Sequence, residues 1–409
     1  MNTKNSRGVR KGLLELRLKN FKSVKAAEID LDPLTIFVGP NASGKSNILN
    51  SLRFLKRALQ EQLMAAVNAE GGIQSVRHKV SGRGRPPKVG MSVRFGLEIN
   101  KELAVVEYGF ELKARRDAEF EVNRERCVVW AGHGVSRSIL AQFDRQGSEL
   151  KMPEKFPVPR LASHRLALPL LTGIENFARV FDALTSVQVY AISPAIIREP
   201  QDPDAGDRLE SDAHNLASVL ADMKIRRKKT YSRLMEYLTN AVPGNPHINP
   251  KRQGNKLGLE LVQQVAEHKT LAFDAYEMSD GTLRLLAILT AIHQRSSPLA
   301  IAIEEPEATI HPGALGVLLD ALRANQERTQ ILISTHSTDV LDRKDIRARS
   351  IRLVQWQNGV TRVAEMGRAS RESVEEGLMT AGELLRANAL RTDSLASVSE
   401  PSVTLFPEL

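Results

Sequence analysis

The chain of 409 residues has little cysteine, few aromatic residues and no long apolar run, and each of these absences argues against a class of protein. Cys127 is its single cysteine, which excludes a disulfide within the chain and a cysteine-based zinc cluster. Aromatic residues make up only 5%, so base-stacking platforms are not its main feature. No apolar run reaches the length of a membrane-spanning helix, and no apolar stretch follows the basic N-terminal residues as in a secretory signal. We therefore expect a cytoplasmic protein without membrane contact.

The remaining composition is that of a globular protein with a basic surface. Hydrophobic residues make up 42% and charged residues 26%, and the length predicts two or three structural units at about 100–200 residues each. The formal net charge is +9, from 57 Lys and Arg against 48 Asp and Glu. This balance favours an anionic partner such as a nucleotide or a nucleic acid. An inert basic surface is the alternative that charge alone leaves open.

Hydrophobic periodicity predicts an α/β fold with an antiparallel addition. Near the beginning, strands are expected at 13–21 and 26–39, followed by one helix at 46–67. Three further strands at 91–99, 103–113 and 119–130 have the alternation of an antiparallel meander. The region 131–172 has weak periodicity and is expected to be irregular.

The second half of the chain alternates between helices and strands, which predicts a parallel core. Here the expected strands are 299–303, 330–334, 350–356 and 360–364, and the expected helices are 174–184, 207–242, 281–294 and 313–324. The Ser-rich residues beyond about 390 are expected to be mobile. We find no internal repeat.

The segment "GPNASGKS" (Gly39–Ser46) fits the phosphate-binding pattern G-x-x-x-x-G-K-[ST]. It follows a predicted strand and opens a predicted helix, which is the context that this motif requires. Glycines let the backbone N–H groups face phosphate oxygens, and the N-terminus of the helix adds positive charge. Lys45 is expected to reach the β- and γ-phosphates, and the Ser46 hydroxyl to bind Mg²⁺. The expected ATP-binding residues are Gly39, Asn41, Ser43, Gly44, Lys45 and Ser46.

A second candidate site is "IAIEEPEATIHP" (Ile301–Pro312), in which an apolar strand ends in adjacent carboxylates. Beside a phosphate loop, Glu304 is expected to serve the Mg²⁺ shell, and Glu305 to be the base that polarises the attacking water. A shared field from Mg²⁺ and Lys45 would make the neighbouring negative charges tolerable. Taken alone, the pattern would equally be a solvated strand end.

These motifs, in this order, resemble the ABC-type ATPase heads of the RecF, SMC and OLD-like group, over about residues 10–70 and 270–360. The resemblance implies a split P-loop ATPase head with an inserted helical arm or lid, and an ATP-dependent homodimer. Its expected parts are 10–130 and 271–365 for the two halves of the head, 131–270 for the arm, and 366–409 for a final helix and tail. General ABC proteins usually have Asp where this chain has Glu304, one methylene longer.

The resemblance assigns further site residues. Ser279 and Gly281, in "MSDGTLRLLAIL", correspond to the signature motif, which contacts the γ-phosphate of a nucleotide held by the other subunit. His336, in "ILISTHS", corresponds to the switch histidine, which contacts the γ-phosphate and the attacking water. Gln74, in "GGIQSV", is the candidate for the γ-phosphate and metal sensor. By itself, each of these short patterns is also an ordinary turn, cap or structural residue.

Two basic stretches are candidates for DNA contact: Arg77–Lys88 and Lys224–Lys229. A solvated run of charge is the alternative for each. The middle of the chain lacks sustained heptads, so we expect a compact arm and not the long coiled coil of SMC proteins. OLD-like nucleases have a Toprim domain of about a hundred residues after the ATPase. Only 73 residues follow His336 here, so we expect no nuclease activity in this chain.

Three functions remain open at this stage. The first is an ATPase that acts on DNA in repair or genome maintenance. The second is an antiphage-defence ATPase that senses or controls a separate effector protein. The third is an ATP-gated scaffold that does not hydrolyse its nucleotide. DNA-stimulated turnover, a stable complex with an effector, or binding without turnover would distinguish them.

Overall fold

The computed structural model describes residues 10–79, 84–116, 119–132, 138–153, 161–295, 297–393 and 403–407. The chain divides into two compact units, which are described separately. Unit 1 comprises Met1–Val187, Ala348–Glu372 and Leu390–Leu409, and unit 2 comprises Gln188–Arg347 and Ser373–Ala389. Within the described residues, no helix is both long and apolar enough to span a membrane.

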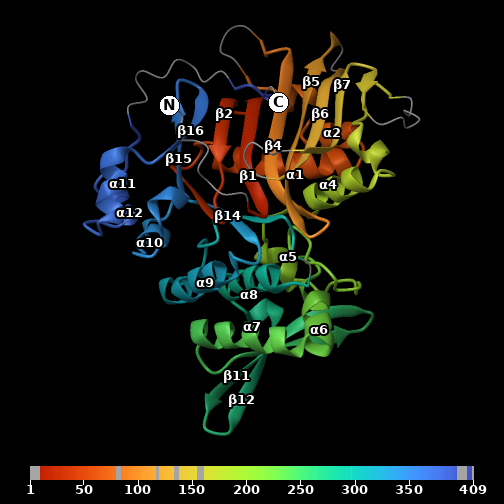
Figure 1. Ribbon diagram of the computed structural model, residues 1–409. Helices are drawn as coiled ribbons and strands as arrows, with labels where there is room; N and C mark the ends of the chain where they lie inside the picture. The colour runs from red at the N-terminus through yellow and green to blue at the C-terminus, as the bar shows by residue number, and fades with distance from the viewer. Residues whose placement is uncertain are drawn as a thin grey trace. The chain divides into compact units, whose positions relative to one another are not determined.

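Unit 1 contains a seven-stranded antiparallel sheet in the order β2-β1-β4-β5-β6-β7-β8 (Figure 1). Its strands are β1 (Gly12–Phe21), β2 (Val24–Asp30), β4 (Lys88–Ile99), β5 (Glu102–Ala114), β6 (Phe120–Ala131), β7 (Ser138–Gln146) and β8 (Glu149–Lys151). The predicted meander is confirmed in β4, β5 and β6. The prediction of an irregular region from residue 131 is wrong, because β7 and β8 extend the sheet. In β7 the inward position after Ala141 and Phe143 is Arg145, so the strand does not alternate in hydrophobicity.

One face of this sheet is apolar and packs against helices. The helices of unit 1 are α1 (Lys45–Gln60), α2 (Leu63–Ala69), α3 (Ile73–Val76) and α4 (Glu175–Ser186). The ring centroid of Phe54 in α1 lies 5.7 Å from that of Phe21 in β1 and 6.3 Å from that of Phe110 in β5. Phe54 thus joins the helix to two strands. The helix predicted at 46–67 is interrupted, because Glu61 and Gln62 are extended.

Three more strands of unit 1 pair with one another outside the seven-stranded sheet. β15 (Ile351–Gln357) pairs in parallel with β3 (Leu34–Val38) and antiparallel with β16 (Val360–Glu365). The predicted strand at 26–39 is thus two strands, β2 and β3, in different sheets.

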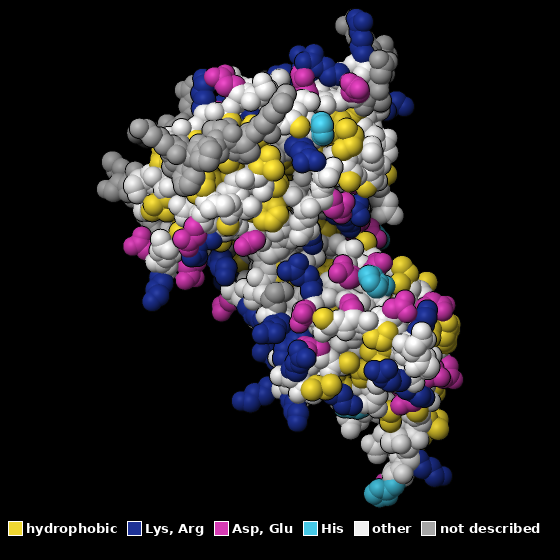
Figure 2. All heavy atoms as spheres, turned by 90° about the vertical axis from the view of Figure 1, so that its right-hand side faces the viewer, with side chains coloured by type: hydrophobic (Ala, Val, Ile, Leu, Met, Phe, Trp, Pro, Cys, Tyr) yellow, Lys and Arg dark blue, Asp and Glu magenta, His cyan; other side chains and the backbone are white. Residues whose placement is uncertain are grey.

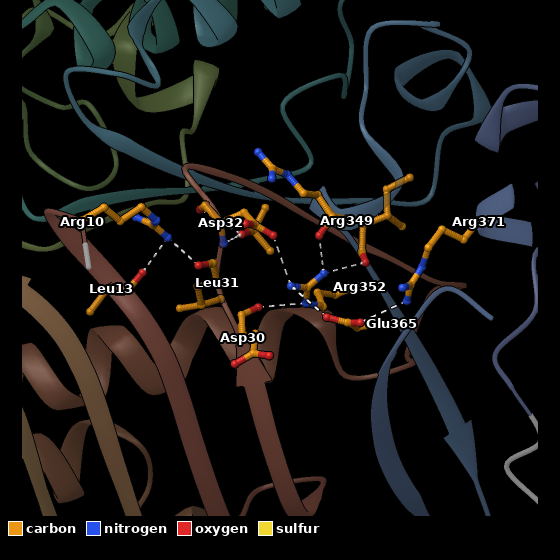
Figure 3. A network of polar contacts seen from close by, with 11 residues as sticks. Arg10, Leu13, Asp30, Leu31, Asp32, Arg349, Arg352, Glu365 and Arg371 are labelled. Carbon is orange, nitrogen blue, oxygen red and sulfur yellow. Dashed lines mark hydrogen bonds and ion pairs between the residues drawn. The ribbon is translucent and has the colours of Figure 1, made fainter. Parts of the chain in front are cut away.

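The buried side chain of Arg352 joins these strands to the end of β2 (Figure 3). Its Nε donates to Asp30 O at 2.8 Å, and its NH2 group lies 3.4 Å from Asp32 Oδ2 and 3.6 Å from Glu365 Oε1. A buried guanidinium is tolerated when carbonyl and carboxylate oxygens surround it. Arg352 therefore fixes β15 and β16 to the N-terminal part of unit 1.

Unit 2 has a parallel core of three strands, β9 (Gln188–Tyr190), β13 (Ala300–Glu304) and β14 (Gln330–Thr335), with β13 between the other two. This confirms the predicted parallel core. The helices are α5 (Pro194–Arg198), α6 (Leu216–Arg226), α7 (Lys228–Ala241), α8 (Asp280–His293), α9 (Pro312–Asn325), α10 (Thr338–Leu341) and α12 (Ala381–Arg386), while α11 (Arg368–Glu375) spans a boundary between the units. The helices α8 and α9 are close to their predicted bounds.

Two features of unit 2 differ from the predictions. The single helix predicted at 207–242 begins only at Leu216 and breaks at Arg227, whose guanidinium pairs with Asp222 at 2.9 Å. A three-stranded antiparallel sheet, β10 (His247–Gln253), β11 (Lys256–Ala266) and β12 (Lys269–Asp274), had no predicted counterpart. β11 and β12 are joined as a hairpin (Figure 1). Residues on both faces are exposed near their shared turn, so the strands show no alternation there.

Candidate nucleotide-binding site

In unit 1 the segment Gly39–Ser46 forms a loop between β3 and α1. Gly44 has a φ of +103° and begins the helix without a side-chain cap, and the first turn has no acidic residue. The first N–H groups of α1 are thus a favourable position for an anion. Lys45 is buried, and its Nζ donates to Gly39 O at 2.7 Å and to Pro40 O at 3.0 Å. Asn41 and Ser46 have exposed side chains.

The loop is supported from behind by residues far away in sequence. Thr361 Oγ1, in β16, donates to Ser43 O at 2.8 Å and is hydrogen-bonded to Ser23 Oγ at 2.7 Å. Asn47 Nδ2, in α1, donates to the same Ser23 Oγ at 2.6 Å. A Cβ on Gly44 would lie 2.1 Å from Thr361 Oγ1, so this position requires glycine for space as well as for φ.

The residues of this loop fit a bound phosphate. A Cβ on Gly39 would lie 2.1 Å from Val354 O, so the backbone passes too close to β15 for a larger residue. The buried Ser43 Oγ has no hydrogen-bond partner among the described residues. A buried polar atom without a partner is costly unless a ligand or water satisfies it. The geometry therefore agrees with the prediction of a nucleotide loop.

Gln74 lies in α3, next to the turn between β1 and β2. Val76 O accepts a hydrogen bond from Lys22 N at 2.8 Å, and the following Ser23 belongs to the support of the loop. The Gln74 side chain is exposed, and its Oε1 accepts a hydrogen bond from Arg77. Its role as a metal or phosphate sensor stays a prediction.

In unit 2 the strands β13 and β14 end with the predicted catalytic pair. Glu304 closes β13, and Glu305 follows with a φ of +44°, a conformation that is unfavourable for a residue with a Cβ. Glu305 N donates to Ser334 O at 3.0 Å, which fixes the backbone at this position. His336 Nδ1, just beyond β14, lies 3.2 Å from Glu305 Oε1, and both side chains are partly exposed. The structure thus brings Glu305 and His336 together.

The third carboxylate of the "EEPE" segment is half-buried, and one of its oxygens is enclosed. Thr335 Oγ1 donates to Glu307 Oε1 at 2.5 Å, while Glu307 Oε2 has no hydrogen-bond partner among the described residues. Burial, aided by the nearby charge of Glu305, raises the pKa of the Glu307 carboxyl.

The segment predicted as the signature motif forms the N-terminus of α8. Ser279 is the N-cap residue, and its Oγ accepts a hydrogen bond from Thr282 N at 3.1 Å. A Cβ on Gly281 would lie 2.4 Å from Thr309 O, so α8 begins directly against the loop that follows "EEPE". Ser279 is exposed in this arrangement.

Arg284, in the second turn of α8, connects this helix with the acidic strand end. Its NH2 group donates to Glu304 O at 2.8 Å and to Glu305 O at 2.9 Å, and its NH1 group to Ile192 O at 3.2 Å. Burial lowers the pKa of this guanidinium, and the carboxylates of the "EEPE" segment oppose that effect. Sequence reasoning missed Arg284, since only the position of its helix against β13 gives it this role.

Among the described residues, no group of three or more His, Cys, Asp or Glu side chains could hold a metal ion by itself. Magnesium usually keeps several waters and binds through one or two protein oxygens together with substrate phosphates. The metal-binding roles of Ser46 and Glu304 stay predictions.

The first basic stretch, Arg77–Lys88, is partly outside the described residues, since 80–83 are not described. Within the part that is described, Arg77 donates to Pro86 O at 2.9 Å and Lys88 pairs with Glu111 at 2.9 Å. These contacts use part of the positive charge within the protein and leave less of it for an external phosphate.

The second stretch, Lys224–Lys229, spans the break between α6 and α7. Lys224 donates to Asn249 Oδ1 at 2.7 Å, and Arg226 and Arg227 pair with Asp222. Lys228 and Lys229 are exposed. Figure 2 shows several Lys and Arg side chains gathered in the lower part of the face it draws, at the height of α6 and α7 in Figure 1.

Two segments of this chain match models of known ATPase-domain families. Residues 13–102 match the family described as "AAA ATPase domain", and residues 193–342 match the family described as "AAA domain, putative AbiEii toxin, Type IV TA system". The first range contains the phosphate loop. The second contains the signature segment, the acidic strand end and His336.

A curated relative matches along nearly the whole chain. The Old nuclease of Escherichia phage P2 is 21% identical over 420 residues, which cover 97% of this chain and 66% of that protein. The chain therefore spans a little less than two thirds of the length of this relative.

Solved structures of SMC heads have a similar fold. An SMC head bound to the C-terminal winged-helix domain of ScpA has a TM-score of 0.54 at 16% identity, with 87% of this chain and 97% of that chain covered. An SMC head with an extended coiled coil, bound to the C-terminal domain of ScpA from Pyrococcus furiosus, has a TM-score of 0.52 at 14% identity, with coverages of 90% and 100%. These findings confirm the α/β fold and the resemblance to ABC-type ATPases of the RecF, SMC and OLD-like group.

Proposed function

We propose that this chain binds Mg²⁺ and ATP at the Gly39–Ser46 loop and hydrolyses the nucleotide with Glu305 and His336. The observation that carries the proposal is the pairing of Glu305 with His336, 3.2 Å apart, at the ends of two adjacent parallel strands. Open α/β sheets place ligands at the carboxyl ends of their strands. A strained backbone that holds an exposed carboxylate there is typical of a functional position.

Each residue has a distinct task in this proposal. The loop amides and Lys45 hold the phosphates. Ser46 would bind Mg²⁺ and Glu304 would serve the outer shell of the ion, which would neutralise charge at the γ-phosphate. Glu305 accepts a hydrogen bond from the attacking water and polarises it. His336 orients the Glu305 carboxylate through the contact between Nδ1 and Oε1. Arg284 fixes the backbone from which both acidic side chains project.

The proposal includes a homodimer that forms on ATP. Ser279 and Gly281 would contact the γ-phosphate of a nucleotide held by the partner subunit, as the family resemblance implies. An exposed Ser279 at the N-terminus of the 14-residue helix α8 is compatible with this, because such an N-terminus favours an anion. ATP would then hold two subunits together, and hydrolysis would release them.

Two uses of this cycle are proposed, with action on DNA in repair or genome maintenance as the first. The exposed Lys228 and Lys229 support it. The second is antiphage defence through control of a separate effector protein. The description of the matching family, which names a toxin–antitoxin system, supports a separate effector partner, and the internal ion pairs that use part of the basic charge argue against DNA as the partner. A scaffold that binds ATP without turnover is the outcome if Glu304 cannot support the metal.

The test is ATP turnover by the wild type and Glu305→Gln, with and without duplex DNA, together with the mass of each in solution. We expect Glu305→Gln to lower turnover by at least 100-fold, about 2.8 kcal/mol, and to accumulate as an ATP-bound dimer. Glu327→Gln makes the same chemical change at an exposed glutamate and should leave both properties unchanged. A wild type that neither hydrolyses ATP nor dimerises with it would rule out the catalytic part of the proposal.

A further inference from the structure

The segment Val403–Pro407 lies on the antiparallel sheet of unit 1, although it is neither helix nor strand. Val403 and Leu405 are only 6% and 4% exposed, whereas Thr404 between them is exposed. The side chains of an extended segment alternate in direction, so two of them are inserted and the third faces away. The segment is thus attached by its side chains and adds no strand to the sheet.

The surface beneath it is the face of the sheet opposite to α1, and it is mostly charged. Residues paired across adjacent strands share one face. One such row, from β1 to β7, consists of Lys19, Gly90, Glu111, Arg124 and Gln146. Gly90 is the one member of this row without a side chain, and it leaves a notch between Lys19 and Glu111.

Leu405 occupies this notch. A Cβ on Gly90 would lie 2.5 Å from Leu405 Cδ1, so any larger residue would displace the leucine. The Leu405 side chain therefore fits the notch by shape. Lys19 and Glu111 border the notch on its two sides. Lys19 and Lys88 each pair with Glu111, at 3.8 Å and 2.9 Å, which holds those walls in place.

Two arginines of β6 recognise the residues that follow. Arg126 NH1 donates to Pro407 O at 2.6 Å, and the Arg124 guanidinium lies 4.7 Å from the centre of the Phe406 ring. Asp144 pairs with Arg124 at 2.6 Å and so fixes the group beneath the ring. A pocket of about 610 Å³ remains open between this part of the sheet and residues Val403–Phe406. The surface thus has separate places for an aliphatic side chain, an aromatic ring and a main-chain carbonyl.

We propose that this surface, here called the Gly90 notch (Lys19, Gly90, Glu111, Arg124 and Arg126), is a docking site for extended peptides of the pattern Val-x-Leu-Phe-Pro. The chain's own Val403–Pro407 is its resident occupant, and a partner protein that carries the same pattern displaces it. An intramolecular ligand competes at a high effective concentration, in the millimolar range for short connections. A partner segment therefore gains access only when it is itself tethered nearby, or binds more tightly than the resident one.

The test uses a fluorescent peptide with the sequence of residues 400–409, titrated with full-length proteins. Leu405→Asp in the full chain places a charge in the notch and should release the resident segment. We expect the Leu405→Asp protein to bind the peptide at least tenfold more tightly than the wild type does. Thr404→Ala is the matched control: because the Thr404 side chain is exposed, this protein should bind the peptide as weakly as the wild type.

Two further variants identify the site of binding. Arg126→Gln, added to the Leu405→Asp protein, should weaken peptide binding several-fold, because the donor to the Pro407 carbonyl is shortened and uncharged. A peptide that itself carries Leu405→Asp should bind none of the proteins. Equal affinity of the wild-type and Leu405→Asp proteins for the native peptide would overturn the proposal.

Other outcomes would also overturn it. If Leu405→Asp lowers the melting temperature sharply and the protein does not bind the peptide, the segment is a permanent part of the fold and not a displaceable ligand. If the wild type is a dimer without ATP and Leu405→Asp converts it to a monomer, the segment belongs to a second copy and the intramolecular assignment is wrong.

Discussion

The phosphate loop of unit 1 and the acidic strand end of unit 2 hold their polar groups in different ways. In the loop, Lys45 and the Ser43 side chain are buried, and Thr361, Ser23 and Asn47 support the backbone through hydroxyl and amide groups. At the strand end, the side chains of Glu305 and His336 are partly exposed, and Glu305 has a strained backbone that Arg284 fixes through two carbonyls. Under the proposed function, the loop serves nucleotide binding and the strand end serves hydrolysis, and the following changes test whether the two can be separated.

The largest expected effect is on the binding side, from Gly44→Ala. The new Cβ would lie 2.1 Å from Thr361 Oγ1, and alanine is strained at a φ of +103°. We expect ATP affinity to fall about 100-fold, or about 2.8 kcal/mol, in a calorimetric titration. Gly316→Ala is the control, because outside its own stretch of the helix α9 no described atom lies within 4 Å of its Cβ position. That variant should bind ATP normally and should gain up to about 1 kcal/mol of stability.

On the chemistry side, Arg284→Ala should lower turnover about 30-fold while the affinity for ATP changes by less than about twofold. The change leaves the carbonyls of Glu304 and Glu305 without their donor, at a cost of about 1–3 kcal/mol, and so moves the Glu305 carboxylate that we propose to be catalytic. Comparison of turnover with nucleotide affinity makes the distinction. Arg284→Lys should restore part of the turnover. Equal losses in both properties would show that the two sites are not separate in this way.

A smaller effect is expected from Thr361→Val, which removes the hydroxyl bound to Ser43 O but keeps the shape of the side chain. The dissociation constant for ATP should rise about fivefold, or about 1 kcal/mol, with turnover at saturating ATP unchanged. Thr361→Ser retains the hydroxyl and should restore the affinity. If serine fails to do so, Thr361 acts through its methyl group in packing and the support of the loop is not a matter of hydrogen bonding.

The smallest effect concerns stability and pH at Glu307. Burial raises the pKa of this carboxyl, so the folded protein binds more protons than the unfolded chain between the ordinary pKa and the raised one. Stability from this group is therefore present at low pH and is lost as the pH rises through that window. Glu307→Gln has no such loss, and its melting temperature should increase relative to the wild type as the pH rises from about 4 to 8. A difference that does not depend on pH would contradict this account.

The sequence predicts the local parts of this molecule better than the contacts between them. The strand, loop and helix around Lys45 were all expected, because one short motif specifies them. Glu305 and His336 were each expected as site residues, but their contact was not, and it follows from the pairing of β13 and β14, whose ends lie at one edge. Thr361, Ser23 and Arg284 were missed, because a single threonine, serine or arginine has no local pattern that reveals its distant partner.

The missed strands have physical reasons of their own. In β7 the buried position 145 is an arginine, which donates to Gly147 O at 2.7 Å and to Ala162 O at 2.9 Å and lies 3.7 Å from the buried Glu125. Because this inward position is charged, the strand does not show the hydrophobic alternation from which it could be predicted. β11 and β12 are exposed on both faces near their turn, with Leu271 51% exposed, so alternation is weak there. In both cases the strand forms by pairing with adjacent strands, and its own residue pattern does not predict it.

The support of the phosphate loop also affects the order in which the protein can mature during synthesis. Thr361 follows Ser43 by 318 residues, and Val354 comes shortly before it. At about 5–20 residues per second, a ribosome needs roughly 15–60 s to add that length. During this time the nascent chain already contains Gly39–Ser46 without the hairpin that holds its bend. A partly made chain therefore passes most of its elongation without a finished nucleotide loop, and ATP can bind firmly only after β15 and β16 have emerged.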